Sequence, residues 1–494
     1  ALVRFTAQNC AMAPALQSDG VTNRSFFQCM TLLLASGIGS GVLVIPRAMA
    51  SVGYMPAALF FFIGALVSGV TTWILSLAVL HVRRVWLEED LRQPLHPSLG
   101  QRATSWQDLQ QHDDSPVSPS IRRTSSYKDL VTRVGPSYGD LVERATPNCP
   151  FVSTILDCVL FLHNTLALTV YFLFVSESYE RLGWIWPINR LGEPYTHIVT
   201  ILWTASWGCF LSTLPTVGGL ARLANASPIV LWLMMGSIWI EWLCNWHVQD
   251  EQTASVEAYT EDWFEKAPSV LCIAVFASFW HTNCVAIARE FNDPTATRLF
   301  ALSFVSAFLL GSLYYFLAFG GYCTFGSRLL EAPNIVTMYG QEDPFFTTVR
   351  LGLAFSLTIA IPLNVFPIRE SVENMQLFNR LPLRLRRQLL GPASDPKLQA
   401  TRQHEIVGVT LVLIPMTLSL CFRNVIQLIT ILGGSLVSLL MIVFPCIVFR
   451  MICPYSILSS PTLVFGICFA GFLALASWNF PVSKWLLDVW HLVT

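Results

Sequence analysis

Eleven apolar stretches, each about as long as a bilayer is thick, constrain this chain more than any other feature. A membrane-spanning helix needs about 20 predominantly apolar residues. The sequence is 53% hydrophobic and only 12% charged, whereas a soluble domain carries roughly 25% charged residues. We therefore predict an all-α polytopic membrane protein surrounded by lipid. The predicted spans are 27–50, 55–81, 151–176, 197–214, 223–246, 268–288, 299–325, 346–368, 404–421, 424–449 and 461–478.

The positions of Lys and Arg predict how these spans are oriented. Cytoplasmic loops are enriched in both residues, and most of the 30 Lys and Arg residues fall on one side if the N-terminal tail, residues 1–26, lies inside. A short surface helix is expected at 137–147. The other predicted connections are a polar inner loop at 83–150, an acidic outer loop at 247–267, a basic inner loop at 369–403 and a C-terminal region, 450–494, that holds the last span.

Glycine residues gather at the middle of the first span, Phe26–Ala48. Gly37, Gly39 and Gly41 lie beside Ser36 and Ser40, and each glycine costs a helix about 1 kcal/mol relative to alanine. Unwound backbone at this depth must line a cavity or bind a ligand. Free N–H groups can then bind a carboxylate, while free carbonyls can bind an ammonium group or Na+. A helix-packing face and a simple kink are the alternative interpretations.

The sixth span, Ser269–Pro294, carries a second polar interruption. Polar side chains in lipid are costly and usually face a cavity or a partner helix. Two interrupted spans at corresponding positions are typical of transporters built from two inverted repeats, which here would occupy 27–246 and 268–449. The side chains that cluster in the middle of the sixth span are Ser278, Trp280, His281, Thr282 and Asn283.

Several motifs along the chain share their order with one known family. The first span contains I-G-S-G-V-L-V-I-P at Ile38–Pro46. The later motifs are His281 with E-F-N-D-P at Glu290–Pro294, G-Y-C-T-F-G at Gly321–Gly326, I-P-L-N-V-F-P-I-R-E at Ile361–Glu370 and L-G-G-S-L-V-S-L-L-M-I-V-F-P at Leu432–Pro445. In these segments the chain resembles the amino acid/auxin permeases, and the resemblance extends over residues 27–478.

The resemblance implies a LeuT-like fold, a 5+5 inverted repeat followed by an eleventh transmembrane helix. Spans 1, 2, 6 and 7 would form a bundle that moves against a scaffold of spans 3, 4, 8 and 9. It also implies an amino acid substrate, with Trp280 as a gating or specificity side chain. Arg47 departs from the family pattern, and snorkelling, pairing with Glu241 and binding of an anionic group are its three interpretations. The implied substrate residues are Ser36, Gly37, Ile38, Gly39, Ser40, Gly41, Ala277, Ser278, Phe279, Trp280, His281 and Thr282.

The ion that would drive transport is left open between H+ and Na+. Na+ in this fold would use first-span carbonyls with hydroxyls of the eighth span, where Ser356 and Thr358 lie; helix back-bonding is the alternative use of such hydroxyls. A proton route would use ionisable groups within spans. Its candidates are Asp157, His163 and His281.

A different class of function competes with transport. A chain with this scaffold could act without transport, as a nutrient sensor or as a structural subunit of a larger membrane complex. The sequence shows no metal-ligand spacing, nucleophile elbow or phosphate loop, so we predict neither an enzyme nor a bound cofactor or metal. The net charge of −1 gives no indication of a nucleic-acid partner.

The organelle is also left open by the sequence. The N-terminus is predicted on the cytosolic side, or on the equivalent matrix side of a mitochondrial membrane. Residues 1–18 hold Arg4 and no acidic side chain, a composition similar to that of a transit peptide. The mitochondrial inner membrane and a vacuolar or endosomal membrane are therefore both retained as hypotheses.

Overall fold

A computed structural model describes residues 24–92, 138–149, 151–182, 192, 195–213, 227–244, 256–332, 334–340, 343–374, 396–422, 424–452, 454 and 459–478. This part of the chain is helical and forms no β-strand. Its elements are α2 (Phe26–Gly37), η1 (Ser40–Leu43), α3 (Ile45–Val52), α4 (Tyr54–Arg92), α6 (Tyr138–Ala145), α7 (Phe151–Glu180), α8 (Tyr195–Ser212), α10 (Ser227–Leu243), α11 (Trp263–Ala277), α12 (His281–Glu290), α13 (Ala296–Phe325), η4 (Gly326–Leu330), η5 (Ile335–Thr337), α14 (Pro344–Asn374), α16 (Pro396–Cys421), α17 (Val425–Ile431), η7 (Leu432–Val437), η8 (Leu439–Val443), α18 (Phe444–Ile452) and α19 (Ser459–Ser477).

Each of the eleven predicted stretches contains helical residues. Eight helical segments of the described chain are long and apolar enough to cross a membrane, and Phe26–Gly37 and Ile229–Leu243 are shorter apolar helices. The total of eleven spans and their division into two repeats of five stay predictions. The eight segments are Tyr54–Val85, Phe151–Glu180, Trp263–Glu290, Ala296–Leu330, Phe345–Pro362, Thr401–Cys421, Val425–Ile452 and Ser460–Ser477.

Some helices extend beyond the predicted limits. The second span was expected to end at 81, but α4 continues to Arg92. Likewise, α11 begins at Trp263, inside the outer loop expected at 247–267. A helix satisfies its backbone internally in water as well as in lipid, so a change from apolar to polar side chains marks the membrane surface and not the end of the helix.

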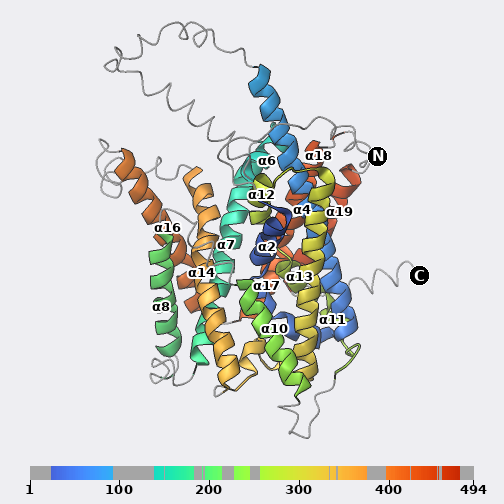
Figure 1. The fold of residues 1–494 in the computed structure, drawn as a ribbon, viewed down its shortest axis with the longest axis vertical. Coiled ribbons are helices and arrows are strands. Elements are labelled where there is room, and N and C mark those ends of the chain that lie inside the picture. The colour runs from blue at the N-terminus through green and yellow to red at the C-terminus, as the bar shows by residue number, and fades with distance from the viewer. Residues whose placement is uncertain are drawn as a thin grey trace, which may run out of the picture.

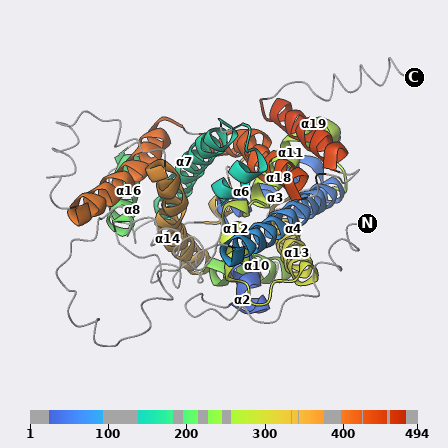
Figure 2. The same cartoon turned by 90° about the horizontal axis from the view of Figure 1, so that it is seen from above.

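The helices form two groups, which are visible in both views of the molecule (Figures 1 and 2). In the bundle group, α4 packs against α11, α12 and α13, and α3 packs against α11 and α13. In the scaffold group, α7 packs against α8, α14 and α16. The scaffold helices α8, α14 and α16 lie on one side, the bundle helices on the other, and α7 lies between them. The two groups contain the spans that the resemblance assigned to the bundle and to the scaffold.

The short surface helix expected at 137–147 is confirmed as α6. Tyr138, Leu141 and Val142 are buried, and α6 packs on α18. The Tyr138 hydroxyl donates to the carbonyl of Leu440 at 2.8 Å. Burial raises the pKa of Tyr138 well above its ordinary value, so its hydroxyl stays a donor. Leu440 lies in η8, a π-helical part of the tenth span, and α6 is thereby joined to that span.

Candidate functional site

The first span is interrupted at its middle, as its glycines predicted. α2 ends at Gly37, Ile38 leaves the helix, and Gly39 is extended with φ −114° and ψ −166°. The chain then forms the short turn η1, in which Val42 N–H donates to the Gly39 carbonyl at 3.3 Å. No side chain caps the start of this turn. The N–H groups of residues 40 and 41 therefore have no acceptor within the turn.

The sixth span is interrupted at the same depth along its length. α11 ends at Ala277, and α12 begins at His281 without a side-chain cap. Between them, Ser278 N–H donates to the Ala274 carbonyl at 3.0 Å, and the Trp280 carbonyl accepts from Asn283 N–H at 3.0 Å. The polar cluster that the sequence predicted as a break is therefore a break in the backbone.

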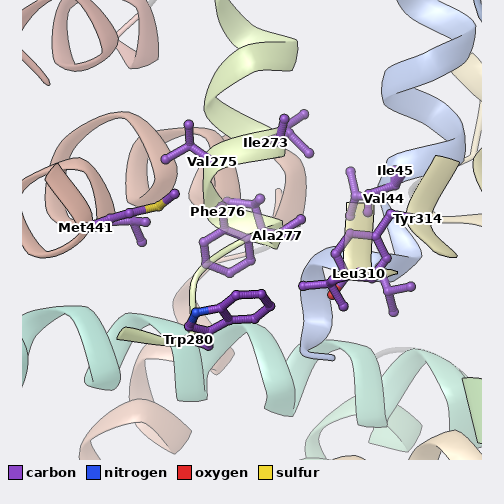
Figure 3. Packing of buried hydrophobic residues seen from close by; sticks show 14 of the residues in the cluster. Val44, Ile45, Ile273, Val275, Phe276, Ala277, Trp280, Leu310, Tyr314 and Met441 are labelled. Atoms are coloured by element: carbon purple, nitrogen blue, oxygen red, sulfur yellow. The ribbon is translucent and has the colours of Figure 1, made fainter. Parts of the chain in front are cut away.

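The two interruptions pack directly against each other. A Cβ atom added to Gly41 would lie 3.0 Å from the Cα of Ala277, and one added to Gly37 would lie 2.6 Å from Cε3 of Trp280. Figure 3 shows Trp280, Phe276 and Ala277 of the sixth span close to Leu310 and Tyr314 of α13 and to the first span. The glycines thus serve both as the weak point of the helix and as the surface that lets the sixth span approach.

Spans 2 and 7 supply hydrogen bonds to the broken backbone. The Tyr314 hydroxyl donates to the Gly37 carbonyl at 2.6 Å. The Ser68 hydroxyl donates to the Ser278 carbonyl at 2.7 Å. Unpaired backbone groups in lipid are costly, and these two bonds remove part of that cost. Both donors were missed from sequence, because hydroxyl groups in spans are common and most of them bond to their own helix.

Trp280 and His281 are both fixed by α4. The indole Nε1–H of Trp280 donates to the Thr72 hydroxyl at 2.7 Å, and the side chain is only 1% exposed. His281 Nε2 lies 2.6 Å from the Thr71 hydroxyl, which also donates to the Val67 carbonyl at 2.7 Å. That donation leaves Thr71 as the acceptor, so we assign the proton of His281 to Nε2.

Phe279 connects the sixth span to the scaffold. Its ring stacks on His281 with centroids 5.5 Å apart and meets the ring of His163 edge to face at 4.7 Å. His163 belongs to α7, which also places the hydroxyl of Tyr171 3.2 Å from the position of a Cβ on Gly39. The structure therefore brings the proton candidate His163 to the broken spans. Tyr171 carried no sequence signal beyond being an aromatic residue in a span.

The remaining ion candidates lie on α7 and α14. Asp157 is half-buried in the first half of α7. The Thr358 hydroxyl donates to the Ala354 carbonyl of its own helix at 2.6 Å, and Ser356 is half-buried on the same helix. Back-bonding is the use of a hydroxyl that competes with Na+ binding, so Thr358 would have to release this bond to coordinate an ion.

Arg47 contacts the connection between α13 and α14. Its guanidinium Nη1 donates to the carbonyl of Ala332, and the side chain is half-buried. The contact that the structure gives for Arg47 is thus a bond to backbone, and the pairing with Glu241 that was considered from sequence stays a prediction. The bond to backbone fits the fork geometry of a guanidinium, which can bind carbonyls while its stem packs against apolar side chains.

Comparison with known families decides the class of this chain. Residues 120–482 match the family described as "Transmembrane amino acid transporter protein". The chain belongs to this family. The match begins after α4, so the broken first span lies outside it, whereas the broken sixth span lies within it.

A relative and a solved structure agree with this assignment. A protein of Toxoplasma gondii, named as a candidate amino acid transporter, AAT1, is 28% identical over 288 residues, which are 56% of this chain and 38% of the relative. The chain thus spans less than two fifths of the length of that relative. The inward-facing conformation of Mhp1 is similar in fold, with a TM-score of 0.50, 11% identity and coverage of 97% of this chain and 95% of that chain. The expected LeuT-like fold is confirmed.

Proposed function

We propose that this protein is a secondary active transporter that moves amino acids across a membrane by alternating access, coupled to H+ or Na+. The observation that carries the proposal is the contact between two broken spans, Ser36–Gly41 and Ala277–Thr282, in a chain of the amino acid transporter family. We expect the substrate to bind at these two segments. The protein is an integral membrane protein, and its N-terminus is proposed to face the cytosol or an equivalent compartment.

The backbone of the two breaks suits a zwitterionic substrate. The first N–H groups of η1 and of α12 are available for the carboxylate, because no side chain caps either start. For the ammonium group, the Gly37 carbonyl is already used by Gly39 N–H and the Tyr314 hydroxyl. The Ser278 carbonyl accepts from the Ser68 hydroxyl, and a carbonyl oxygen has two lone pairs, so one lone pair can take a second donor. Ser278 is therefore our candidate acceptor for the ammonium group.

Alternating access requires that the site lie between parts that move relative to each other. The breaks belong to the bundle group. His163 and Tyr171 belong to α7 of the scaffold group. His163 contacts Phe279, and Tyr171 approaches Gly39. A rocking motion between the groups would open and close this contact. We propose that substrate binds at this contact and that its release accompanies the motion.

The proposal is tested by uptake of radiolabelled amino acids into proteoliposomes under an imposed H+ or Na+ gradient. We expect saturable uptake with one of the two gradients, and its loss in Gly39→Leu, because the new side chain would collide with the Tyr171 hydroxyl. The matched control is Gly236→Leu in α10, where no heavy atom lies within 4 Å of an added Cβ. Folded protein that takes up no amino acid under either gradient would favour the sensor or structural role instead.

A further inference from the structure

His163 is a buried histidine whose Nδ1 has no hydrogen-bond partner among the described residues. Its side chain is 4% exposed, and Nδ1 is fully buried without a donor or acceptor. Buried polar groups are nearly always paired, so a buried imidazole nitrogen without a partner among the described residues indicates a group that is completed by something outside the chain.

The location of His163 connects it to the two broken spans. It lies on α7, and its ring meets that of Phe279 at 4.7 Å. Phe279 is one of the three residues between α11 and α12 and keeps part of its surface exposed, although Ser278 and Trp280 beside it are buried. His281, which stacks on Phe279, is anchored through Nε2 to Thr71. Nδ1 of His163 has no such anchor among the described residues and is therefore available for binding.

The surroundings of His163 favour a neutral partner. No ion pair involves this side chain in the described residues, and an unpaired charge within a membrane is costly. A neutral imidazole presents one N–H donor and one acceptor nitrogen. A hydroxyl or carboxamide group has the same pair of functions and complements it without charge.

We infer that His163 binds the side chain of the substrate and selects amino acids whose side chains carry a neutral hydrogen-bonding group, a hydroxyl or a carboxamide. The inference deepens the proposed function and rests on it. The backbone of the two breaks holds the α-amino and α-carboxyl groups, Phe279 forms an apolar wall of the side-chain subsite, and His163 supplies its polar contact. Aliphatic side chains of the same shape leave the imidazole unpaired and bind more weakly.

The test compares threonine with valine, which differ by a hydroxyl in place of a methyl group. In proteoliposomes the wild-type protein is expected to prefer threonine by at least about 10-fold, the effect of one lost hydrogen bond to a buried group. His163→Leu is expected to lower this ratio to about 1 while valine uptake is retained, and His163→Gln, which keeps a donor and an acceptor, restores part of the preference. His197→Leu, in α8 of the scaffold group, where the imidazole Nδ1 lies 2.9 Å from Oε1 of Glu180, leaves the ratio unchanged.

A purely structural role for His163 predicts a different outcome. Loss of packing would lower threonine and valine uptake together. The inference is overturned if the wild-type protein shows no preference for threonine, or if the preference survives in His163→Leu. Thermal stabilisation of the detergent-purified chain by each amino acid separates this inference from transport itself. Suppose that threonine stabilises the wild-type protein but not His163→Leu, and that neither protein takes up any amino acid. This result upholds the inference and overturns the transport proposal. Absence of stabilisation by threonine overturns the inference.

Discussion

Replacing Gly433 with alanine is expected to lower the free energy of unfolding by about 3 kcal/mol, at the upper end of the usual cost of overpacking. Gly433 lies in η7, the π-helical part of the tenth span, which packs on α11. An added Cβ would overlap the backbone carbonyl oxygen of Cys272 and lie 3.0 Å from the Cβ of Phe276. Backbone in a buried helix cannot move aside as a flexible side chain can. The substitution would therefore separate the tenth span from α11, the first half of the sixth span.

Thermal melting of the detergent-purified variant would measure this effect. Gly471→Ala in α19 is the matched control, because no heavy atom lies within 4 Å of an added Cβ there. We expect the control to melt within a few degrees of the wild type, or slightly above it, since alanine favours a helix over glycine. If Gly433→Ala melts at the same temperature as Gly471→Ala, η7 and α11 are not in the close contact described.

Arg350→Leu is the second substitution with a large expected effect. We expect it to lower the free energy of unfolding by about 3 kcal/mol or more. Arg350 on α14 is fully buried. Its Nη2 donates to the carbonyls of Tyr339 at 2.6 Å and Val336 at 3.1 Å, and Nη1 donates to the carbonyl of Gly340 at 3.0 Å. A hydrogen bond to a charged group is worth roughly 1.5–3 kcal/mol. Leucine would leave three carbonyls of the connection between α13 and α14 without these donors.

The melting temperature of Arg350→Leu, compared with that of Arg350→Lys, would test the fork geometry. An ammonium group cannot reach three carbonyls as a guanidinium can, so we expect Arg350→Lys to recover only part of the loss. Arg298→Leu serves as the control for removal of an arginine, since 42% of that side chain is exposed. Equal melting temperatures for Arg350→Leu and Arg298→Leu would contradict the structural role of Arg350.

The features that could be predicted from sequence are those with a local physical cause. A span must be apolar over its whole length, so the stretches that became α7, α13 and α19 were visible without any knowledge of their neighbours. Gly37, Gly39 and Gly41 likewise weaken the first span by their own chemistry. The break at Ser278–Trp280 was predicted because polar side chains are costly in lipid and usually face a cavity or a partner helix.

The features that were missed depend on partners far along the chain. Tyr314 and Ser68 complete the broken backbone, yet neither differs in sequence from many hydroxyl-bearing residues in spans. Arg47 donates to the backbone carbonyl of Ala332, and no sequence pattern identifies a backbone carbonyl as the acceptor for a particular side chain. The π-helical turns η7 and η8 also left no local signature beyond Gly433 and Gly434, whose small size could equally have served ordinary helix packing.

The proposed function depends on substrate binding between the two broken spans. A density map of the protein in lipid nanodiscs, determined with and without a saturating transported amino acid, tests this claim most directly. We expect added density bounded by residues 36–41 and 277–282, with its side-chain end toward Phe279. Density for the amino acid at another place, with none between these two segments, would contradict it.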